Sequence, residues 1–310
     1  MEISDFRFGL QIEPAYQSEI HDLKSAINMI PSIEFGGAGP SLHFAAANGY
    51  PPGAYRPLIE TLTPHYRVCS MLFRPLWPGI GGPNGLRDWS PFVDDLIRFL
   101  DEHGARDVIG LGHSLGSVAT VLAALRRPDL FRAVVMIDPV IFPRGLLFLW
   151  TVLEKVGVGQ HFHPFHSAAL KRQRVFESAN AAYEHYRRKT VFSRIGDEHL
   201  RLCAESLMRP RADGKVELAF PPEWEARIYA VGPLVDWQLW REIKNLRLPL
   251  LIVRGGEPEP GWPDVADKIQ QRLPHTVIRT VAGGGHLVPL EKPDEVGKTI
   301  QEFLNTNVTN

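Results

Sequence analysis

The segment Gly112-His113-Ser114-Leu115-Gly116 restricts what this chain can fold into more than any other. An apolar run at 107–111 precedes it and is typical of a buried parallel strand. Apolar residues then recur at helical spacing from Val118 to Leu125. A strand, a tight turn and a helix are the context in which a G-x-S-x-G motif presents a nucleophilic serine. The alternative is a glycine-rich connection in which Ser114 is passive.

Length and charge limit the class of protein. The chain has 310 residues, 44% of them hydrophobic, which fits one large globular α/β domain that carries an insertion. Lys and Arg number 34 against 35 Asp and Glu, so nothing in the charge favours nucleic acid or an anionic membrane. The apolar stretch 146–150 is too short to cross a bilayer, and we expect no stable membrane insertion.

The amino-terminal residues and the cysteines bear on location. The segment 1–5 is acidic and lacks the basic and apolar regions of a secretory signal. Cys69 and Cys203 lie far apart in the sequence, and Cys69 falls in a strand-like run. We therefore expect reduced thiols and a cytoplasmic protein, with a disulfide between the two as the alternative.

Strand-like and helix-like segments alternate along most of the chain, which predicts a parallel sheet with helices on both faces. The expected strands are 6–12, 33–35, 42–47, 67–73, 107–111, 133–137, 249–253 and 276–281. The alternation stops at Pro139 and resumes near Trp237. Between them we expect helices at 146–155, 167–186 and 198–208.

The G-x-S-x-G segment, the late Gly283-Gly284-Gly285-His286 and the helical insertion together resemble the α/β-hydrolase fold superfamily. The resemblance covers nearly the whole chain after about residue 30. It implies an α/β fold with a mostly parallel eight-stranded sheet flanked by helices and a helical cap inserted after strand six. The expected domains are a core at 1–139 and 231–310 and a cap, or lid, at 140–230.

A serine hydroxyl needs a base, and His286 is the leading candidate. It follows the strand at 276–281 through a glycine run, which places it at the carboxyl edge of the sheet with Ser114. The alternative is a solvated or structural histidine. His113 is a weaker candidate because neighbouring residues of a tight turn point in different directions.

A catalytic triad also needs an acid that orients the base, and several carboxylates of this chain are candidates. Many relatives carry it after the seventh strand in a Gly-x-x-Asp pattern, but this chain has Pro258 at that offset from Gly255. Glu259 reaches the offset only from Gly256, and Glu257 is a further alternative. Other relatives, such as some haloalkane dehalogenases, place the acid after the sixth strand. Asp138 ends an apolar strand there, and a carboxylate at such a strand end is costly to bury without a hydrogen-bond partner, for which His286 is suited. We therefore favour Asp138, with Glu259 as the alternative.

Two backbone amides are expected to stabilise an oxyanion. One is the N–H of Leu115, directly after the serine. By position the other is the N–H of Tyr50, because Asn48-Gly49-Tyr50 stands where relatives carry His-Gly-x. The alternative for this loop is an ordinary turn.

The serine also limits the type of reaction that the chain can catalyse. Relatives that open epoxides or remove halides use Asp at this position, so Ser114 favours acyl transfer. We predict a serine carboxylic-ester hydrolase for small to medium apolar esters, working through an acyl-enzyme without a cofactor. A thioesterase or carbon–carbon hydrolase with the same triad is the alternative, and a non-catalytic receptor of this fold is a weaker one. The expected partner is a small-molecule ester, and a homodimer is left open.

The insertion contains two further clusters of residues that could bind a ligand. The run His161–His166 resembles a metal site but has no carboxylate or Cys nearby, so we predict no metal and an aromatic lining of the cap. The basic residues Arg172, Arg174 and 187–189 favour a solvated helix face over an anion site.

Overall fold

A seven-stranded sheet forms the centre of the protein. The computed structural model describes residues 29–155, 164–257 and 264–308. The strands are β1 (Ser32–Gly36), β2 (Ser41–Ala45), β3 (Arg67–Met71), β4 (Val108–His113), β5 (Phe131–Ile137), β9 (Leu250–Gly255) and β10 (Val277–Val281). Their order is β1-β3-β2-β4-β5-β9-β10, and every neighbouring pair is parallel except β1 with β3.

The central strands are covered on both faces, which explains their continuous apolar runs. All six residues of β4 are buried. In β5, Val134 and Met136 join one apolar cluster while Val135 and Ile137 join the other. Alternate side chains of a strand point to opposite faces, so each strand contributes to two cores.

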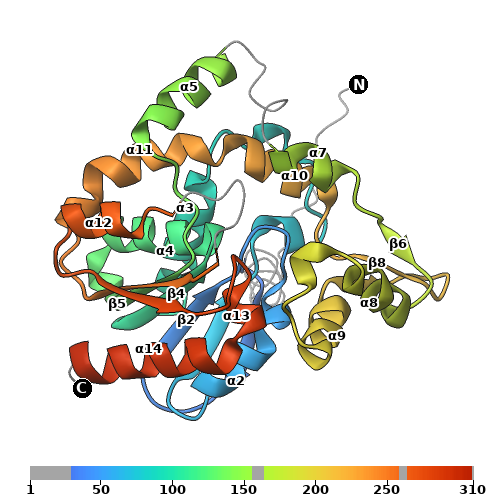
Figure 1. The fold of residues 1–310 in the computed structure, drawn as a ribbon, viewed down its shortest axis with the longest axis horizontal. Coiled ribbons are helices and arrows are strands. Elements are labelled where there is room, and N and C mark those ends of the chain that lie inside the picture. Colours follow the sequence, from blue (N-terminus) through green and yellow to red (C-terminus); the bar gives the residue numbers. More distant parts are fainter. Residues whose placement is uncertain (1–28, 156–163, 258–263, 309–310) are drawn as a thin grey trace, which may run out of the picture.

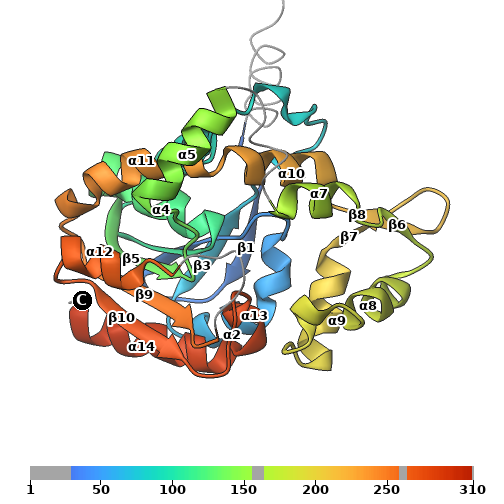
Figure 2. The same cartoon turned by 45° about the horizontal axis from the view of Figure 1, so that its top comes forward.

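Helices complete the two outer layers of this sandwich (Figure 1). One layer holds α3 (Ser90–Glu102), α4 (Leu115–Arg126), α11 (Pro233–Glu242) and α12 (Ala266–Arg272). The other holds α2 (Arg56–Leu62), α13 (Val288–Glu291) and α14 (Pro293–Asn307). The turned view in Figure 2 shows α11 and α12 on the side of the sheet opposite to α14.

The sheet and its helices confirm the predicted α/β-hydrolase fold with a mostly parallel sheet. Seven of the eight expected strands coincide with strands of the sheet. The eighth, at 6–12, lies outside the described residues. None of the helices in the described ranges is both long and apolar enough to cross a bilayer.

The insertion lies between β5 and β9 and is not purely helical. It contains α5 (Arg144–Lys155), α7 (Pro164–Leu170), α8 (Ala179–Arg187), α9 (Asp197–Ser206) and α10 (Pro222–Val231). It also holds a small antiparallel sheet of order β6-β8-β7, made of β6 (Val175–Phe176), β7 (Met208–Pro210) and β8 (Val216–Leu218). This sheet stands with α8 and α9 to one side of the main sheet (Figure 2).

The expected single helix at 167–186 is therefore wrong. The chain leaves α7 at Leu170, pairs through Val175 and Phe176 with β8, and re-enters a helix at Ala179. Ser178 caps that helix, because its side chain accepts the N–H of Ala181 at 3.1 Å. Phe176 is buried in the core, so packing of this strand outweighs the helical pattern around it.

Trp89 fastens the end of the insertion to the core. Its indole N–H donates to the carbonyl of Ile228 in α10 at 2.9 Å. Its ring lies against Gly232, where an added Cβ would be 2.4 Å from the ring. The side chain is 5% exposed. This contact fixes where α10 passes into α11.

We expect Trp89→Phe to lower the free energy of unfolding by about 1–3 kcal/mol, because it removes a hydrogen bond and leaves a gap beside Gly232. The measurement is urea denaturation followed by circular dichroism. Trp237→Phe is the matched control: this indole also donates to one partner, Thr151, but is 39% exposed, so the change should stay within about 0.5 kcal/mol. Equal losses in both variants would contradict the anchoring role.

Candidate active site

Ser114 lies in a sharp, strained turn between β4 and α4. Its φ is 54° and its ψ −115°, a region that residues with a side chain rarely occupy. Two glycines allow this turn. A Cβ at Gly112 would lie 2.3 Å from the backbone of Gly116, and one at Gly116 would lie 2.0 Å from the carbonyl oxygen of Ala45.

Hydrogen bonds hold the turn against the end of the neighbouring strand. The N–H of Ser114 donates to the carbonyl of Ile137 at 3.0 Å. The hydroxyl of Ser117 reaches the carbonyls of Gly112 at 2.6 Å and Ile137 at 3.0 Å. The strain at Ser114 is thus balanced by contacts from β5, and the serine sits at the carboxyl ends of the strands.

His286 and Asp138 meet at the same edge of the sheet. The imidazole Nδ1 of His286 lies 2.5 Å from Oδ2 of Asp138, and the side chains are 11% and 23% exposed. The other carboxylate oxygen of Asp138 lies 3.4 Å from the N–H of Gly255. A carboxylate beside Nδ1 holds the proton on that atom and leaves Nε2 as an acceptor, the form that a general base requires.

The loop that carries His286 is fixed by a second carboxylate. The N–H of Gly285 donates to Oε2 of the buried Glu291 at 2.6 Å. The loop also crosses close over Gly255 at the end of β9, where a Cβ would lie 2.4 Å from the carbonyl oxygen of Gly285. A side chain at Gly255 would therefore push the histidine loop away from Asp138.

Of the acids suggested by the sequence, the structure brings Asp138 to His286. Glu259 lies outside the described residues. Glu257 is exposed, and its N–H donates to the carbonyl of Gly284 at 2.9 Å. Asp138 itself has a φ of 38°, a left-handed conformation that Asp and Asn tolerate better than most residues.

His113 has both ring nitrogens engaged and is not available as a base. Nε2 lies 2.8 Å from the carbonyl oxygen of His286, and Nδ1 lies 2.7 Å from the hydroxyl of Tyr55. A carbonyl only accepts, so Nε2 carries the proton and Nδ1 accepts from Tyr55. Burial, together with the nearby His286, lowers the pKa of His113 well below its usual value, so the ring is neutral.

The sequence analysis did not predict the contact between His113 and Tyr55. Tyr55 in turn receives the N–H of Ala47 at 3.3 Å, so a chain of hydrogen bonds runs from the loop after β2 to the backbone of His286. The position of His113 beside the serine was the one hint that this histidine has a role, but nothing along the sequence pointed to Tyr55 as its partner.

The two expected oxyanion amides lie at the same edge. Leu115 is the first residue of α4, where backbone N–H groups are free of helical partners. The N–H of Tyr50 lies 3.3 Å from the carbonyl of Ala47, a long turn bond. Gly49, directly before Tyr50, has a φ of 84°. The side-chain amide of Asn48 donates to the carbonyl of Glu225 in α10 at 3.0 Å.

Ser114 and His286 line one cavity of about 220 Å³, which we call the Ser114 cavity. The core contributes Ala47, Asn48, Tyr50 and Leu287 to its wall. The insertion contributes Phe165, Arg172, Tyr186, Phe192, Glu225 and Tyr229, among others. The cavity therefore lies between the core and the insertion, with an apolar wall interrupted by a few polar groups, as is usual for small-molecule sites.

Arg172 does not lie on a solvated helix face, and that expectation is wrong for this residue. Its guanidinium is paired with Glu225 and donates to the hydroxyl of Tyr186 at 3.2 Å. Burial alone lowers the pKa of Arg172, but Glu225 and Tyr186 outweigh it and raise the pKa, so the group stays charged. Arg174, by contrast, is half exposed and pairs with Glu223.

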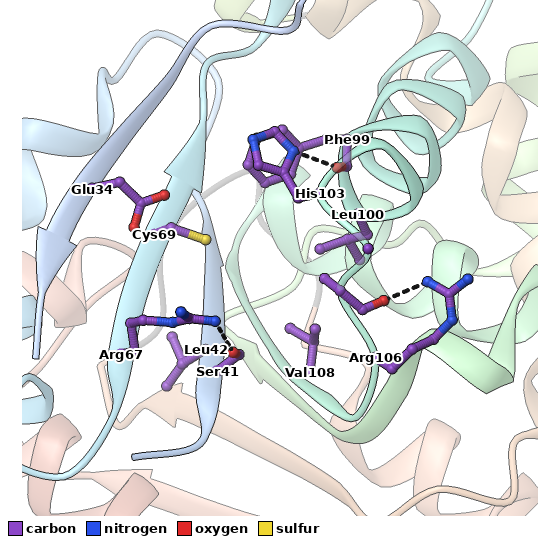
Figure 3. A pocket seen from close by; sticks show the side chains of 12 residues that line it. Glu34, Ser41, Leu42, Arg67, Cys69, Phe99, Leu100, His103, Arg106 and Val108 are labelled. Atoms are coloured by element: carbon purple, nitrogen blue, oxygen red, sulfur yellow. Dashed lines mark hydrogen bonds between the residues drawn. The ribbon is translucent and has the colours of Figure 1, made fainter. Parts of the chain in front are cut away.

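A larger cavity of about 520 Å³ lies at the opposite edge of the sheet (Figure 3). Ser41, Arg67 and Val108 in its wall are the first residues of β2, β3 and β4. Ser41 accepts from Arg67 at 3.0 Å, and His103 donates to the carbonyl of Phe99 at 2.8 Å. The serine and the histidine of this cavity are thus each bonded to a neighbour in the cavity wall and not to each other, whereas the pair His286 and Asp138 lies at the other edge.

The histidine-rich run His161–His166 is described only from Pro164 onward. His161 and His163 lie outside the described residues. Within the described ranges, no group of three or more His, Cys, Asp and Glu could hold a metal ion.

The chain resembles known proteins in both sequence and structure. A family model described as the alpha/beta hydrolase family matches residues 37–299. Strigolactone esterase D14 of Arabidopsis thaliana is 28% identical over 295 residues, which cover 92% of this chain and 98% of that protein. (E)-2-((N-methylformamido)methylene)succinate hydrolase of Acinetobacter baylyi is 22% identical over 277 residues, 87% of this chain and 92% of that protein. The crystal structure of E-2-(acetamidomethylene)succinate hydrolase superposes with a TM-score of 0.69 at 23% identity, covering 88% of this chain and 94% of that one.

The strained turn predicts a difference between two substitutions of the serine. Ser114→Gly should be more stable than Ser114→Ala by about 1 kcal/mol, because glycine adopts a positive φ without strain whereas alanine keeps it. Urea denaturation of both variants gives this difference directly. Equal midpoints, with equal slopes, would show that the backbone at position 114 is not strained.

Proposed function

The chain belongs to the alpha/beta hydrolase family, and from that premise we propose that it is a serine carboxylic-ester hydrolase. In this proposal Ser114 is the nucleophile, His286 the base and Asp138 the acid that orients the base. The observation that carries it is the hydrogen bond between His286 and Asp138, because His286 also lines one cavity with the strained Ser114.

Acylation begins when the hydroxyl oxygen of Ser114 attacks the ester carbonyl. Nε2 of His286 takes the hydroxyl proton as the new C–O bond forms. Asp138 keeps the Nδ1 proton in place and stabilises the imidazolium. The imidazolium then gives its proton to the leaving alcohol as the ester bond breaks, which leaves the acyl group on Ser114.

Deacylation repeats these steps with water. His286 takes a proton from a water molecule that attacks the acyl carbon, and returns it to Ser114 as the free acid leaves. In both steps we propose that the N–H groups of Leu115 and Tyr50 stabilise the oxyanion. Leu115 also lies at the positive end of α4, and an oxyanion would compete with the long turn bond of the Tyr50 amide.

We further propose that residues 140–230 act as a cap over the core at 1–139 and 231–310. The cavity wall supports this division, because the reacting groups come from the core whereas Phe165, Phe192 and Tyr229 come from the insertion. Aromatic and aliphatic walls suit a small or medium acyl group more than an extended polymer.

Ser114→Ala should lower kcat for p-nitrophenyl butyrate roughly a thousandfold or more, the usual loss for a triad member. A fluorophosphonate should add covalently to the wild-type chain, and peptide mass spectrometry should place it on Ser114. Ser41→Ala, in the cavity at the other edge of the sheet, is the matched control and should keep activity and labelling. Turnover that survives Ser114→Ala would exclude the proposed nucleophile.

Asp138→Asn should lower kcat by roughly 10⁴-fold, since the amide no longer holds the base in its working tautomer. Asparagine tolerates the left-handed backbone at this position, so the fold should persist. Glu257→Gln and Glu259→Gln, assayed alongside, should stay near the wild-type rate. Loss of activity in Glu259→Gln with an active Asp138→Asn would instead make Glu259 the acid.

A further inference from the structure

The Ser114 cavity contains a buried cation that the proposed ester hydrolysis does not use. Arg172 lies in the turn after α7, lines the same cavity as Ser114 and His286, and has a side chain only 19% exposed. Burying a guanidinium is costly unless it is paired, and Glu225 supplies the partner.

The pairing leaves part of the guanidinium free to bind another group. A guanidinium has five N–H donors in a planar fork. Its bonds within the described chain run from Nη1 to Glu225 and from Nη2 to the hydroxyl of Tyr186. Because these bonds hold Arg172 in place in the cavity wall, its remaining donors are oriented in advance, which favours a planar acceptor such as a carboxylate.

The charge of the cavity wall also favours an anion. Three charged side chains line it in the described part of the chain: Arg172, Lys189 and Glu225. Arg172 and Glu225 neutralise each other, so Lys189 leaves the wall with one positive charge. Lys189 is exposed at its end of the cavity, where it is positioned to attract an incoming anion.

We propose that this cavity selects acyl substrates that carry one carboxylate, which Arg172 binds and Lys189 attracts. The proposal rests on the proposed hydrolase function and adds the substrate class to it. Glu225 acts as a positioning residue in this site, because it holds the guanidinium and offsets the cost of burying it.

The test compares charged and neutral substrates of the same shape. One pair is the mono-p-nitrophenyl ester of adipic acid and its methyl ester, which places the carboxylate on the acyl side. The other is 4-acetoxybenzoate and its methyl ester, which places it on the leaving group. Each kcat/KM is divided by the rate of hydroxide-catalysed hydrolysis of the same compound, and the charged-to-neutral ratio is the readout.

We expect wild type to prefer the charged member of at least one pair. Arg172→Gln should lower that ratio by about 10- to 100-fold, the usual effect of losing a hydrogen bond to a charged group. Lys189→Gln should lower it a few-fold, and the wild-type preference should weaken as salt is raised. Arg174→Gln is the matched control: this arginine pairs with Glu223, does not line the cavity and should leave the ratio unchanged.

Removing Arg172 alone leaves Glu225 buried without its partner, so the variant Arg172→Gln/Glu225→Gln is measured as well. It restores neutrality and should show the same loss of ratio while the neutral esters are still turned over. A wild type that prefers the neutral member of both pairs, or a ratio that survives in the double variant, would overturn the proposal. Failure of the hydrolase function itself would appear separately, as turnover that does not depend on Ser114.

Discussion

The hydrogen bond between His286 and Asp138 forms only if three strands of the sheet lie in the right order. Asp138 directly follows β5, and His286 follows β10, with β9 lying between those strands. The two side chains meet only because the histidine loop passes directly over Gly255, the last residue of β9. The same β5 end accepts the N–H of Ser114 through Ile137. The parallel order β4-β5-β9-β10 therefore places Ser114, Asp138 and His286, the proposed nucleophile, acid and base, at one edge, where ligands of open α/β sheets generally bind.

A second set of hydrogen bonds links the backbone of His286 to His113 and Tyr55. His113 accepts a hydrogen bond from the hydroxyl of Tyr55 and donates one to the carbonyl of His286. Tyr55 is buried and belongs to the short helical turn Pro52–Tyr55, against which α9 of the insertion packs. The side chain of His286 is thus held by Asp138 of the core. Its backbone carbonyl is held, through His113 and Tyr55, by a segment that also supports the insertion. Positioning of this kind would let His286, as the proposed base, act without rearranging during the reaction.

The sequence was sufficient for the parts of the fold that depend on local patterns. Strands buried on both faces appear as continuous apolar runs, and the spacing around Ser114 predicted a strand, a turn and a helix. The acid was only partly decided in this way: the sequence favoured Asp138 but kept Glu259 open, because both fall between Ser114 and His286 in chain order. Choosing between them needs the path of the loop over Gly255. The burial of Arg172 was equally out of reach, since its partner Glu225 lies 53 positions away and both stand among other charged residues.

The insertion also contacts the loop that is expected to bind the oxyanion. Asn48 donates to the carbonyl of Glu225, and the carboxylate of Glu225 lies so close to Gly49 that a Cβ there would be 3.0 Å from its carboxyl carbon. An unpaired carboxylate at this distance would oppose the negative charge that develops on the substrate oxygen. Pairing with Arg172 removes that conflict, because the ion pair carries no net charge. The same arginine would then serve two purposes, since it shields the oxyanion loop from Glu225 and offers its remaining donors to the substrate.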